Sequence, residues 1–349
     1  MTSYVFVLGA GFSKAINSAM PVLEELGKEV VGRLGDDIPY VPPGLDPKDF
    51  ENWLSYLAED QPWLLPEEQF RNKSGFVRVS REISKIIVER EYATKSRPIP
   101  DWLRSLISFW HESKASIVTF NYDRLVESAY EQTVYVKNDR APQDTVNYVD
   151  ARQILTAPVT PVGARSGAIL EANEVETFGL TKLHCSRSWL YSGRESFYGE
   201  TIYELVGQSG WNAGGPSSRD MRLSLDKVPL VIPPTTGKSG FFNNESVRSE
   251  WAAARNGLRA DLVYFVGYSF PPSDAMTRFL LQDSHHPQRK IIVVNRSEAP
   301  HNQLLKLVPS DSVGAPIIGD SPIEELAARL QPSTTTPEAN IAWTLESKL

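Results

Sequence analysis

Short, nearly unbroken apolar runs recur along the chain, separated by longer stretches of mixed polarity. They occupy residues 4–8, 116–120, 180–184, 230–232, 262–267 and 291–294, and they are rich in β-branched and aromatic side chains. Strands buried on both faces of a parallel sheet have this composition, because neither of their faces carries alternating polar residues. The pattern therefore predicts that these runs are strands of a parallel sheet.

Helical spacing of apolar residues follows most of these runs. It covers residues 12–34, where Pro21 interrupts the pattern early, and then residues 124–131 and 275–282. A strand followed by a helix, repeated along the chain, indicates parallel strands joined by helical crossovers. We therefore predict an α/β fold with a Rossmann-like, doubly wound parallel sheet.

Longer segments interrupt this alternation. Residues 36–112 carry Trp and Glu at helical spacing and are expected to form a helical insertion. Residues 134–177 and 191–226 contain Gly and Pro turns, which indicate either loops or a small subdomain over the sheet edge. A polar, Pro-containing stretch opens a C-terminal tail, 332–349. The expected organisation is one nucleotide-binding domain, 1–349, that contains the insertion.

Composition narrows the function further. The single cysteine among 349 residues, Cys185, excludes an intrachain disulfide and a multi-cysteine zinc site. We therefore expect no metal and a reducing, cytoplasmic environment. No run approaches the roughly 20 apolar residues of a membrane-spanning helix, so no membrane partner is expected. The net charge of −7 gives no reason to expect direct nucleic-acid binding.

A glycine-rich turn follows the first apolar run, in the order Gly9, Ala10, Gly11, Phe12 and Ser13. Glycines let a pyrophosphate approach the backbone closely, and the start of the next helix offers N–H groups to it. The third glycine of the full dinucleotide fingerprint is absent, so a tight turn without a ligand is the alternative. Its place at the first strand-to-helix junction favours phosphate binding.

Polar residues also follow the second and third runs. Asn121 and Asp123 come directly after residues 116–120, where Asn121 can bind a ribose hydroxyl or a water. Helix capping is an equally good explanation of this pair. His184 ends the third run and can act as a general base, although a lone histidine is more often structural. Its neighbour Cys185 lacks the sequence signature of a catalytic cysteine and is interpreted as a small apolar residue.

Two further strand exits carry small or polar residues. Gly267 and Ser269 follow the run at 262–267, and Asn295 follows the run at 291–294. Each alone is compatible with a simple turn. Because the carboxyl ends of parallel strands meet at one sheet edge, the four exits together predict a ligand site there.

In this order, the motifs resemble those of the Sir2 superfamily, and more closely the Sir2-like proteins of bacterial antiphage defence systems. The resemblance implies that the chain binds NAD through Gly9, Ala10, Gly11, Phe12 and Ser13. It implies that Asn121 and Asp123 lie by the nicotinamide ribose, with Asn121 helping to place a water. His184 would be the general base, and Gly267, Ser269 and Asn295 would line the adenosine side.

Departures from the family pattern point to a particular reaction. Sir2 deacetylases carry a four-cysteine zinc module, and this chain has one cysteine. Their Gly-Ile-Pro-Asp-Phe-Arg loop is replaced at 18–23 by Ser-Ala-Met-Pro-Val-Leu, and their His-Gly pair is His184-Cys185. Water is then favoured as the acceptor. The expected activity is an NAD+ glycohydrolase, a hydrolase that depletes NAD+ in antiviral defence. The alternatives are a catalytically silent nucleotide-sensing module and a zinc-free NAD-dependent deacylase.

The resemblance also implies controlled activity, through a homo-oligomer or a separate partner protein such as a HerA-type ATPase. Within the predicted insertion, Trp53, Trp63, Trp102 and Trp110 are candidates for an assembly surface. Ordinary core packing is the better expectation for most of these side chains.

Overall fold

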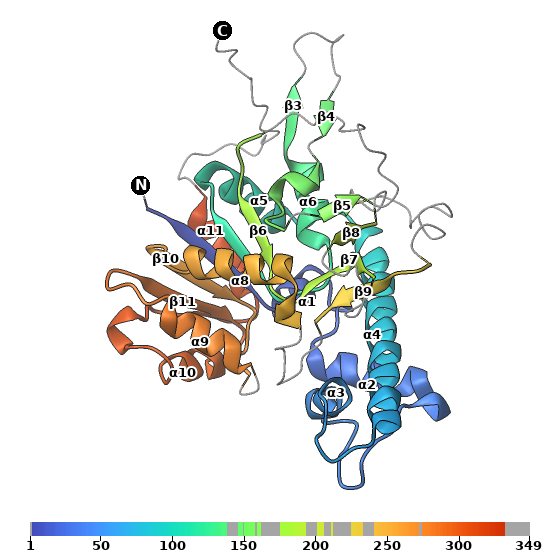
Figure 1. The fold of residues 1–349 in the computed structure, drawn as a ribbon. Helices are drawn as coiled ribbons and strands as arrows, with labels where there is room; N and C mark the ends of the chain where they lie inside the picture. The colour runs from blue at the N-terminus through green and yellow to red at the C-terminus, as the bar shows by residue number, and fades with distance from the viewer. Residues whose placement is uncertain are drawn as a thin grey trace.

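A six-stranded parallel sheet forms the centre of the computed structural model (Figure 1). The structure describes residues 2–137, 146–148, 150–157, 159–161, 175–192, 201–205, 211, 225–232, 241–271 and 274–331, so the predicted tail at 332–349 lies outside the described residues. The strands are, in sheet order, β12 (Ile317–Ile318), β11 (Lys290–Asn295), β10 (Leu262–Val266), β1 (Tyr4–Leu8), β2 (Ser116–Thr119) and β6 (Gly179–Lys182).

The strand order reverses between β1 and β10. The chain builds β1, β2 and β6 outward on one side and then returns to place β10, β11 and β12 on the other. This is the Rossmann order, in which the crevice for a ligand opens at the carboxyl ends of the strands where the order reverses. The predicted α/β fold with a doubly wound parallel sheet is confirmed.

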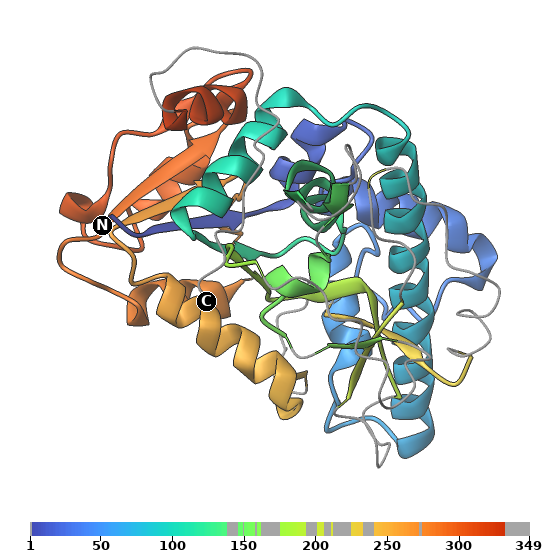
Figure 2. The same ribbon diagram turned by 90° about the horizontal axis from the view of Figure 1, so that it is seen from above.

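Helices cover both faces of this sheet, because successive strand residues point to opposite sides. On β1, Phe6 and Leu8 pack toward one helical layer, and Val5 and Val7 pack toward the other. The first layer holds α1 (Ala10–Ile16), α5 (Asp101–Ser113), α6 (Leu125–Thr133) and α11 (Pro322–Leu330), and the second holds α8 (Glu245–Gly257), α9 (Ala275–Asp283) and α10 (Ala299–Leu304) (Figure 2).

A helical lobe extends from the carboxyl edge of the sheet and has a core of its own. It comprises α2 (Leu23–Leu34), α3 (Phe50–Ala58) and the long α4 (Pro66–Lys95) (Figure 1). Trp53 is fully buried in this core, whereas Trp110 on α5 is fully buried against the main sheet. Trp102 is partly buried, and Trp63 alone of the four candidate tryptophans is largely exposed, at 71%. Core packing thus explains most of them.

A second sheet lies beside the lobe and was only partly predicted. Its order is β5 (Val159–Pro161), β8 (Ile202–Glu204), β7 (Cys185–Tyr191) and β9 (Val228–Val231). The assignment of 230–232 to the parallel sheet is wrong, because β9 pairs antiparallel with β7. A short apolar run that is buried on both faces gives no sign of which sheet it joins.

Other boundaries also differ from the sequence expectation. The helical pattern at 12–34 divides into α1 and α2, and the connecting residues contain Pro21. The two-residue strand β12 was missed because it is too short to show a pattern. The remaining elements are β3 (Tyr135–Lys137), β4 (Val146–Tyr148) and the 3₁₀ turns Gly35–Asp37, Ala151–Ile154, Phe241–Asn243 and Ser310–Ser312. Among the described helices, none has the length and apolar character needed to cross a membrane.

The exits of β1 and β10 pack directly against each other, and only glycines permit this. The N–H of Gly11 donates to the carbonyl of Gly267 over 3.0 Å. A Cβ on Gly9 would lie 2.5 Å from that same carbonyl oxygen. Gly267 has φ +64°, and a Cβ there would lie 2.3 Å from the backbone nitrogen of Phe12. Backbone packing alone therefore requires glycine at these positions, whether or not a ligand binds there.

Replacing Gly267 with alanine should destabilise the fold by more than about 1 kcal/mol, since the Cβ meets backbone atoms and the residue has positive φ. Gly32 on α2 has no atom within 4 Å of an added Cβ, so Gly32→Ala should be neutral or stabilising. Urea unfolding of both variants measures the difference. Equal stability of the two variants would contradict this account of the turn.

Candidate functional site

A cavity of about 610 Å³ opens at the carboxyl edge of the main sheet, beside the β1–β10 switch point. Phe12 does not line it, because its side chain is buried in the core against Trp102 and Trp110. The other predicted site residues all line this one cavity: Gly9, Ala10, Gly11, Ser13, Asn121, Asp123, His184, Gly267, Ser269 and Asn295.

The N–H groups of the glycine-rich turn already have partners within the protein. Gly9 donates to Val266, Gly11 donates to Gly267, and Phe12 donates to Gly9. The sequence suggested that these glycines exist to let a phosphate approach. In the structure these glycines allow two strand exits to meet. The three N–H groups already donate to backbone carbonyls, so they are not available to a phosphate at this turn.

Ser13, Asn121 and Asp123 form a continuous hydrogen-bonded group at the cavity wall. The Asn121 Nδ2 donates to the Gly9 carbonyl and to Ser13 Oγ, each over 2.9 Å. Ser13 Oγ in turn donates to Asp123 Oδ2 over 2.6 Å. The carbonyl partner fixes the orientation of the Asn121 amide. Its Oδ1 accepts no hydrogen bond from the part of the chain that the structure describes, so it remains available as an acceptor.

The Asp123 carboxylate contacts both the start of α6 and the cavity wall. Its Oδ1 accepts the N–H of Leu125 at the start of α6, over 3.1 Å, and its Oδ2 accepts the hydroxyl of Ser13. Burial raises the pKa of Asp123, against the opposing effects of Lys182 and the Ser13 hydroxyl. The N-cap position of α6 is Arg124, so Asp123 supports the helix start from one residue earlier, and it lines the cavity as well.

His184 lies in the turn between β6 and β7, two residues beyond the end of β6. Its imidazole is buried among aromatic rings, with the edge of Phe120 at a centroid distance of 5.2 Å and the nearly parallel ring of Tyr122 at 6.2 Å. The backbone carbonyl of His184 accepts the N–H of Ile232, and the Tyr122 hydroxyl donates to the Ile232 carbonyl. These contacts limit how far the ring can move.

The neighbouring Cys185 has a left-handed backbone, with φ +64°. A non-glycine residue is uncommon in this conformation, which indicates local strain. The thiol is buried beside Trp189 and Ile232, and burial raises its pKa well above the usual range. A protonated, buried thiol is a poor nucleophile, in agreement with its interpretation as a small apolar neighbour.

On the other side of the glycine turn, a recess of about 240 Å³ shares Gly11, Val22, Gly267 and Asn295 with the main cavity. The Asn295 side chain bridges two segments there, donating to the Tyr268 carbonyl and accepting the N–H of Arg296. The recess adds Lys14, Trp102, Arg296 and Asp320 to the lining.

Much of the cavity wall was not predicted from the sequence. Segment 20–24, Leu26, Glu51 and Ile87 come from the helical lobe and the connection into it. The comparison with the family loop marked residues 18–23, but no motif marks Leu26, Glu51 and Ile87, which reach the site only through the packing of the lobe. None of the described Lys or Arg side chains lines the main cavity, whereas the carboxylates of Glu24, Glu51, Asp123 and Asp274 do.

A buried carboxylate on α4 joins the two segments that carry Asn121 and His184. Glu91 accepts the backbone N–H of Arg124 over 3.0 Å and binds the guanidinium of Arg187 through both oxygens, over 2.7 and 2.6 Å. The backbone N–H of Arg187 donates to the carbonyl of Tyr122. Burial alone would raise the pKa of Glu91, but Arg187 and Lys95 lower it to about 2.

A second buried ion pair, between Lys182 and Glu127, supports the same region. The Lys182 ammonium donates to the Asp123 carbonyl over 2.7 Å and to Glu127 over 2.9 Å, and its exposed fraction is 1%. The backbone N–H of Lys182 donates to Glu250 on α8. Burial raises the pKa of Glu250 to about 7. Both catalytic-candidate segments are thus anchored to buried charges on neighbouring helices.

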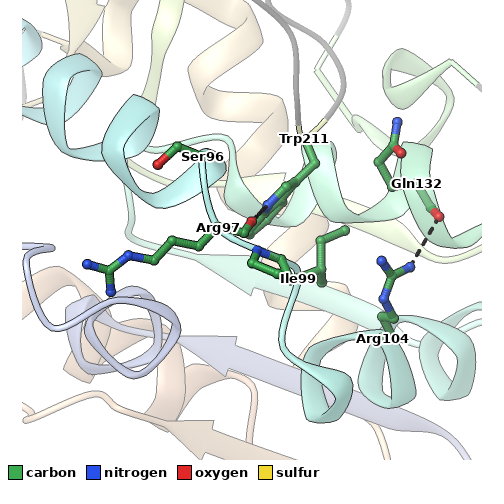
Figure 3. Close-up of a pocket in the computed structure, with 7 residues that line it drawn as sticks. Ser96, Arg97, Ile99, Arg104, Gln132 and Trp211 are labelled. Atoms are coloured by element: carbon green, nitrogen blue, oxygen red, sulfur yellow. Dashed lines mark hydrogen bonds between the residues drawn. The ribbon is translucent and has the colours of Figure 1, made fainter.

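Another cavity, of about 280 Å³, lies at the junction of α4 and α5 (Figure 3). Trp211 donates from its indole to the Arg97 carbonyl, and Arg104 donates to the carbonyl of Gln132 over 3.4 Å. The guanidinium of Arg97 points away from the cavity (Figure 3). This cavity contains none of the predicted site residues. In the described part of the chain, no three His, Cys, Asp or Glu side chains are grouped to hold a metal.

No family model matches the chain, and no curated protein matches it. A solved structure of Sir2 in complex with the inhibitor EX-527, 2'-O-acetyl-ADP-ribose and a deacetylated p53 peptide superposes with a TM-score of 0.39 and 13% identity, covering 94% of this chain and 92% of that chain. The fold assignment made above stands on the strand order and parallel pairing of the chain itself.

The variant Glu91→Gln should lose roughly 3–5 kcal/mol of unfolding free energy at neutral pH, because it removes the negative charge that both oxygens of Glu91 present to the buried Arg187 guanidinium. The pKa of Glu91 falls from 4.5 to about 2 on folding, so the charged form stabilises the native state above pH 4.5. The difference from the natural chain should therefore shrink as the pH falls from 4.5 toward 2. Denaturant titrations at several pH values measure it.

The matched control is Glu89→Gln on the same helix. Glu89 is 56% exposed and pairs with Arg33, so its loss should cost at most about 1 kcal/mol. Equal losses of unfolding free energy in the two variants would contradict the stabilising role of the Glu91–Arg187 pair. A loss in Glu91→Gln that does not change with pH would contradict it as well.

Proposed function

We propose that the protein is an NAD+ glycohydrolase, which cleaves the bond between nicotinamide and ribose and releases nicotinamide and ADP-ribose. The observation that carries this proposal is that Asn121 and His184, from separate strand exits, line the same cavity at the switch point of a Rossmann sheet. A general base and an oriented polar acceptor at one site are what attack by water requires.

The reaction breaks the C1'–N bond, and its electron pair neutralises the pyridinium ring that leaves. Positive charge then develops on the ribose, water adds at C1', and the water proton passes to a base. Asn121 Oδ1 is an available acceptor for a water or a ribose hydroxyl, and its amide is oriented by Gly9 and Ser13. In this proposal His184 takes the proton.

The electrostatics of the main cavity suit this substrate. A carboxylate near a developing cation stabilises it, most strongly where water is excluded. Glu51 and Asp123 line the cavity, and no described Lys or Arg side chain lines it. The adjoining recess is lined by two cations, Lys14 and Arg296, and by two carboxylates, Asp320 and Glu324. Because Lys14 pairs with Glu25, Arg296 is the candidate contact for a phosphate of a dinucleotide. Two joined compartments on either side of the glycine turn match a ligand with two nucleosides.

The proposed biological role is depletion of NAD+ in bacterial antiviral defence. It rests on the resemblance of the ordered motifs at 9–13, 119–123, His184, 267–269 and Asn295 to Sir2-like defence proteins. Control through self-association or a partner protein such as a HerA-type ATPase belongs to the same proposal.

The proposal predicts NAD-dependent release of nicotinamide by the purified chain, with a partner protein added where the chain alone is silent. Asn121→Ala and His184→Ala should each reduce the rate by about 100-fold or more, because each removes a group that acts on the attacking water. Chromatographic quantification of nicotinamide and ADP-ribose gives the rates.

Asn256→Ala and His285→Ala are the matched controls, since both side chains are exposed and neither lines the cavity. They should retain the natural rate. Undiminished turnover by Asn121→Ala and His184→Ala would refute the assignment. Nicotinamide release that needs an acylated peptide would indicate a deacylase, and tight NAD binding without turnover would indicate a nucleotide-sensing module.

A further inference from the structure

A buried carboxylate, that of Glu250 on α8, covers the outer edge of the main sheet, where α8 packs across β6 (Figure 1). β6 is the last strand in the sheet order, so the backbone groups on its outer side need other partners. The N–H of Thr156 donates to the carbonyl of Leu180 there, over 3.1 Å. Glu250 Oε2 accepts the N–H of Lys182 over 2.6 Å. The carboxylate thus pairs with the strand edge two residues before His184.

Glu250 is buried without an ion pair. Its exposed fraction is 1%, and in the described part of the chain no Lys or Arg side chain forms an ion pair with it. The ammonium of Lys182 donates instead to the Asp123 carbonyl and to Glu127. Burial of a carboxyl group that lacks a paired cation favours its neutral form. Burial accordingly raises the pKa of Glu250 to about 7.

Thr156 can pair with Glu250 in either protonation state. Its hydroxyl donates to Oε1 of the ionised carboxylate. When Glu250 is protonated, the same hydroxyl oxygen can accept the carboxyl proton, because a threonine both donates and accepts. The Thr156 hydroxyl then has two other acceptors within reach, the Leu180 carbonyl at 3.3 Å and Thr181 Oγ1 at 3.2 Å. The two states are both hydrogen-bonded and differ by one buried negative charge.

Few other charges face Glu250 from the elements packed around it. Among the described elements in contact with α8, β2 and the 3₁₀ turn at 241–243 have no ionisable side chain. The charge of Lys182 acts on Glu250 and lowers its pKa, but the effect of burial is larger. The ionisable residues of the surrounding elements are Lys182 on β6, Cys185 on β7, Arg278 and Asp283 on α9, and the exposed Glu245, Arg248 and Arg255 on α8 itself.

We propose that Glu250 is a proton switch at the edge of β6, and that its charge regulates His184 in the turn that follows. That turn joins β6 to β7 and leads directly into Cys185. Burial raises the pKa of the Cys185 thiol, and the charge of Glu250 raises it further, so this charge acts on the end of the turn. A nearby negative charge favours the imidazolium form of a histidine. Loss of the proton from Glu250 therefore makes His184 a stronger base.

The effect on His184 rests on the proposed function, because it matters to catalysis only if His184 takes the proton of the attacking water. The switch itself does not rest on that function. Its existence can be measured on the chain without NAD+.

The first test is the infrared spectrum of the full chain across neutral pH, compared with that of Glu250→Gln. A glutamine keeps both contacts, because its oxygen can accept the Lys182 N–H and its nitrogen can donate to Thr156. At about pH 6 the natural chain should show the carbonyl band of a protonated carboxyl group that Glu250→Gln lacks. This band should fade as the pH rises through about 7.

Thr156→Val is the second variant. It removes a hydroxyl that lowers the pKa of Glu250, so the band should persist to higher pH. Glu245→Gln on the same helix is the control, since Glu245 is exposed, and it should keep the natural band. A natural chain without the band at about pH 6, or a band that Glu250→Gln retains, would overturn the switch.

The second test follows the ring resonances of His184 by NMR. In the natural chain they should show an extra inflection at the pH where the infrared band fades, and in Glu250→Gln this inflection should be absent. Nicotinamide release by Glu250→Gln should be roughly 3- to 10-fold slower than that of the natural chain at about pH 8, where the natural Glu250 is charged.

The outcomes separate the switch from the proposed reaction. A natural chain that shows the band and the inflection but releases no nicotinamide at any pH would refute the glycohydrolase and support the switch. A chain that cleaves NAD+ with the same pH profile in the natural form and in Glu250→Gln would refute the regulation and support the glycohydrolase.

Discussion

The contact between the exits of β1 and β10 is the constraint on which the rest of the site depends. Gly9 and Gly11 lie against Gly267 so closely that a Cβ on Gly9 or Gly267 would meet backbone atoms within 2.5 Å. This contact brings two central strands of the sheet to one point at their carboxyl ends. Ser13, in the first helix after that point, can then reach Asp123 and Asn121 from the next strand exit. The cavity opens beside this contact, at the carboxyl edge of the sheet.

Buried charges hold the remaining parts of the site in place. Glu91 on α4 ties the segment after β2 to the start of β7 through Arg124 and Arg187, and Lys182 ties the end of β6 to Asp123. A buried pair of this kind contributes little net stability but is costly to break, so it fixes geometry more than it adds to the free energy of folding. The helical lobe is therefore a structural part of the site.

The sequence revealed the sheet and the strand-exit residues because both leave local signals. Apolar runs marked five of the six parallel strands; Asn121, Asp123 and Asn295 each followed such a run, and His184 ended one. It did not reveal that 228–231 joins a second sheet, that Phe12 turns into the core, or that Glu51, Glu91 and Ile87 approach the site. Those facts depend on contacts between residues far apart in the chain, which no local pattern encodes. The glycines were identified correctly as special, but backbone packing now explains them.

In the proposed reaction, the switch-point cavity holds a dinucleotide with its nicotinamide ribose at Asn121 and His184. The most direct test is a crystal structure of the His184→Ala variant soaked with NAD+. We expect density for NAD+ across the main cavity and the adjoining recess, with the nicotinamide ribose within hydrogen-bonding distance of Asn121 Oδ1. A dinucleotide bound in the opposite orientation, with adenosine at Asn121, or bound outside this cavity would contradict it.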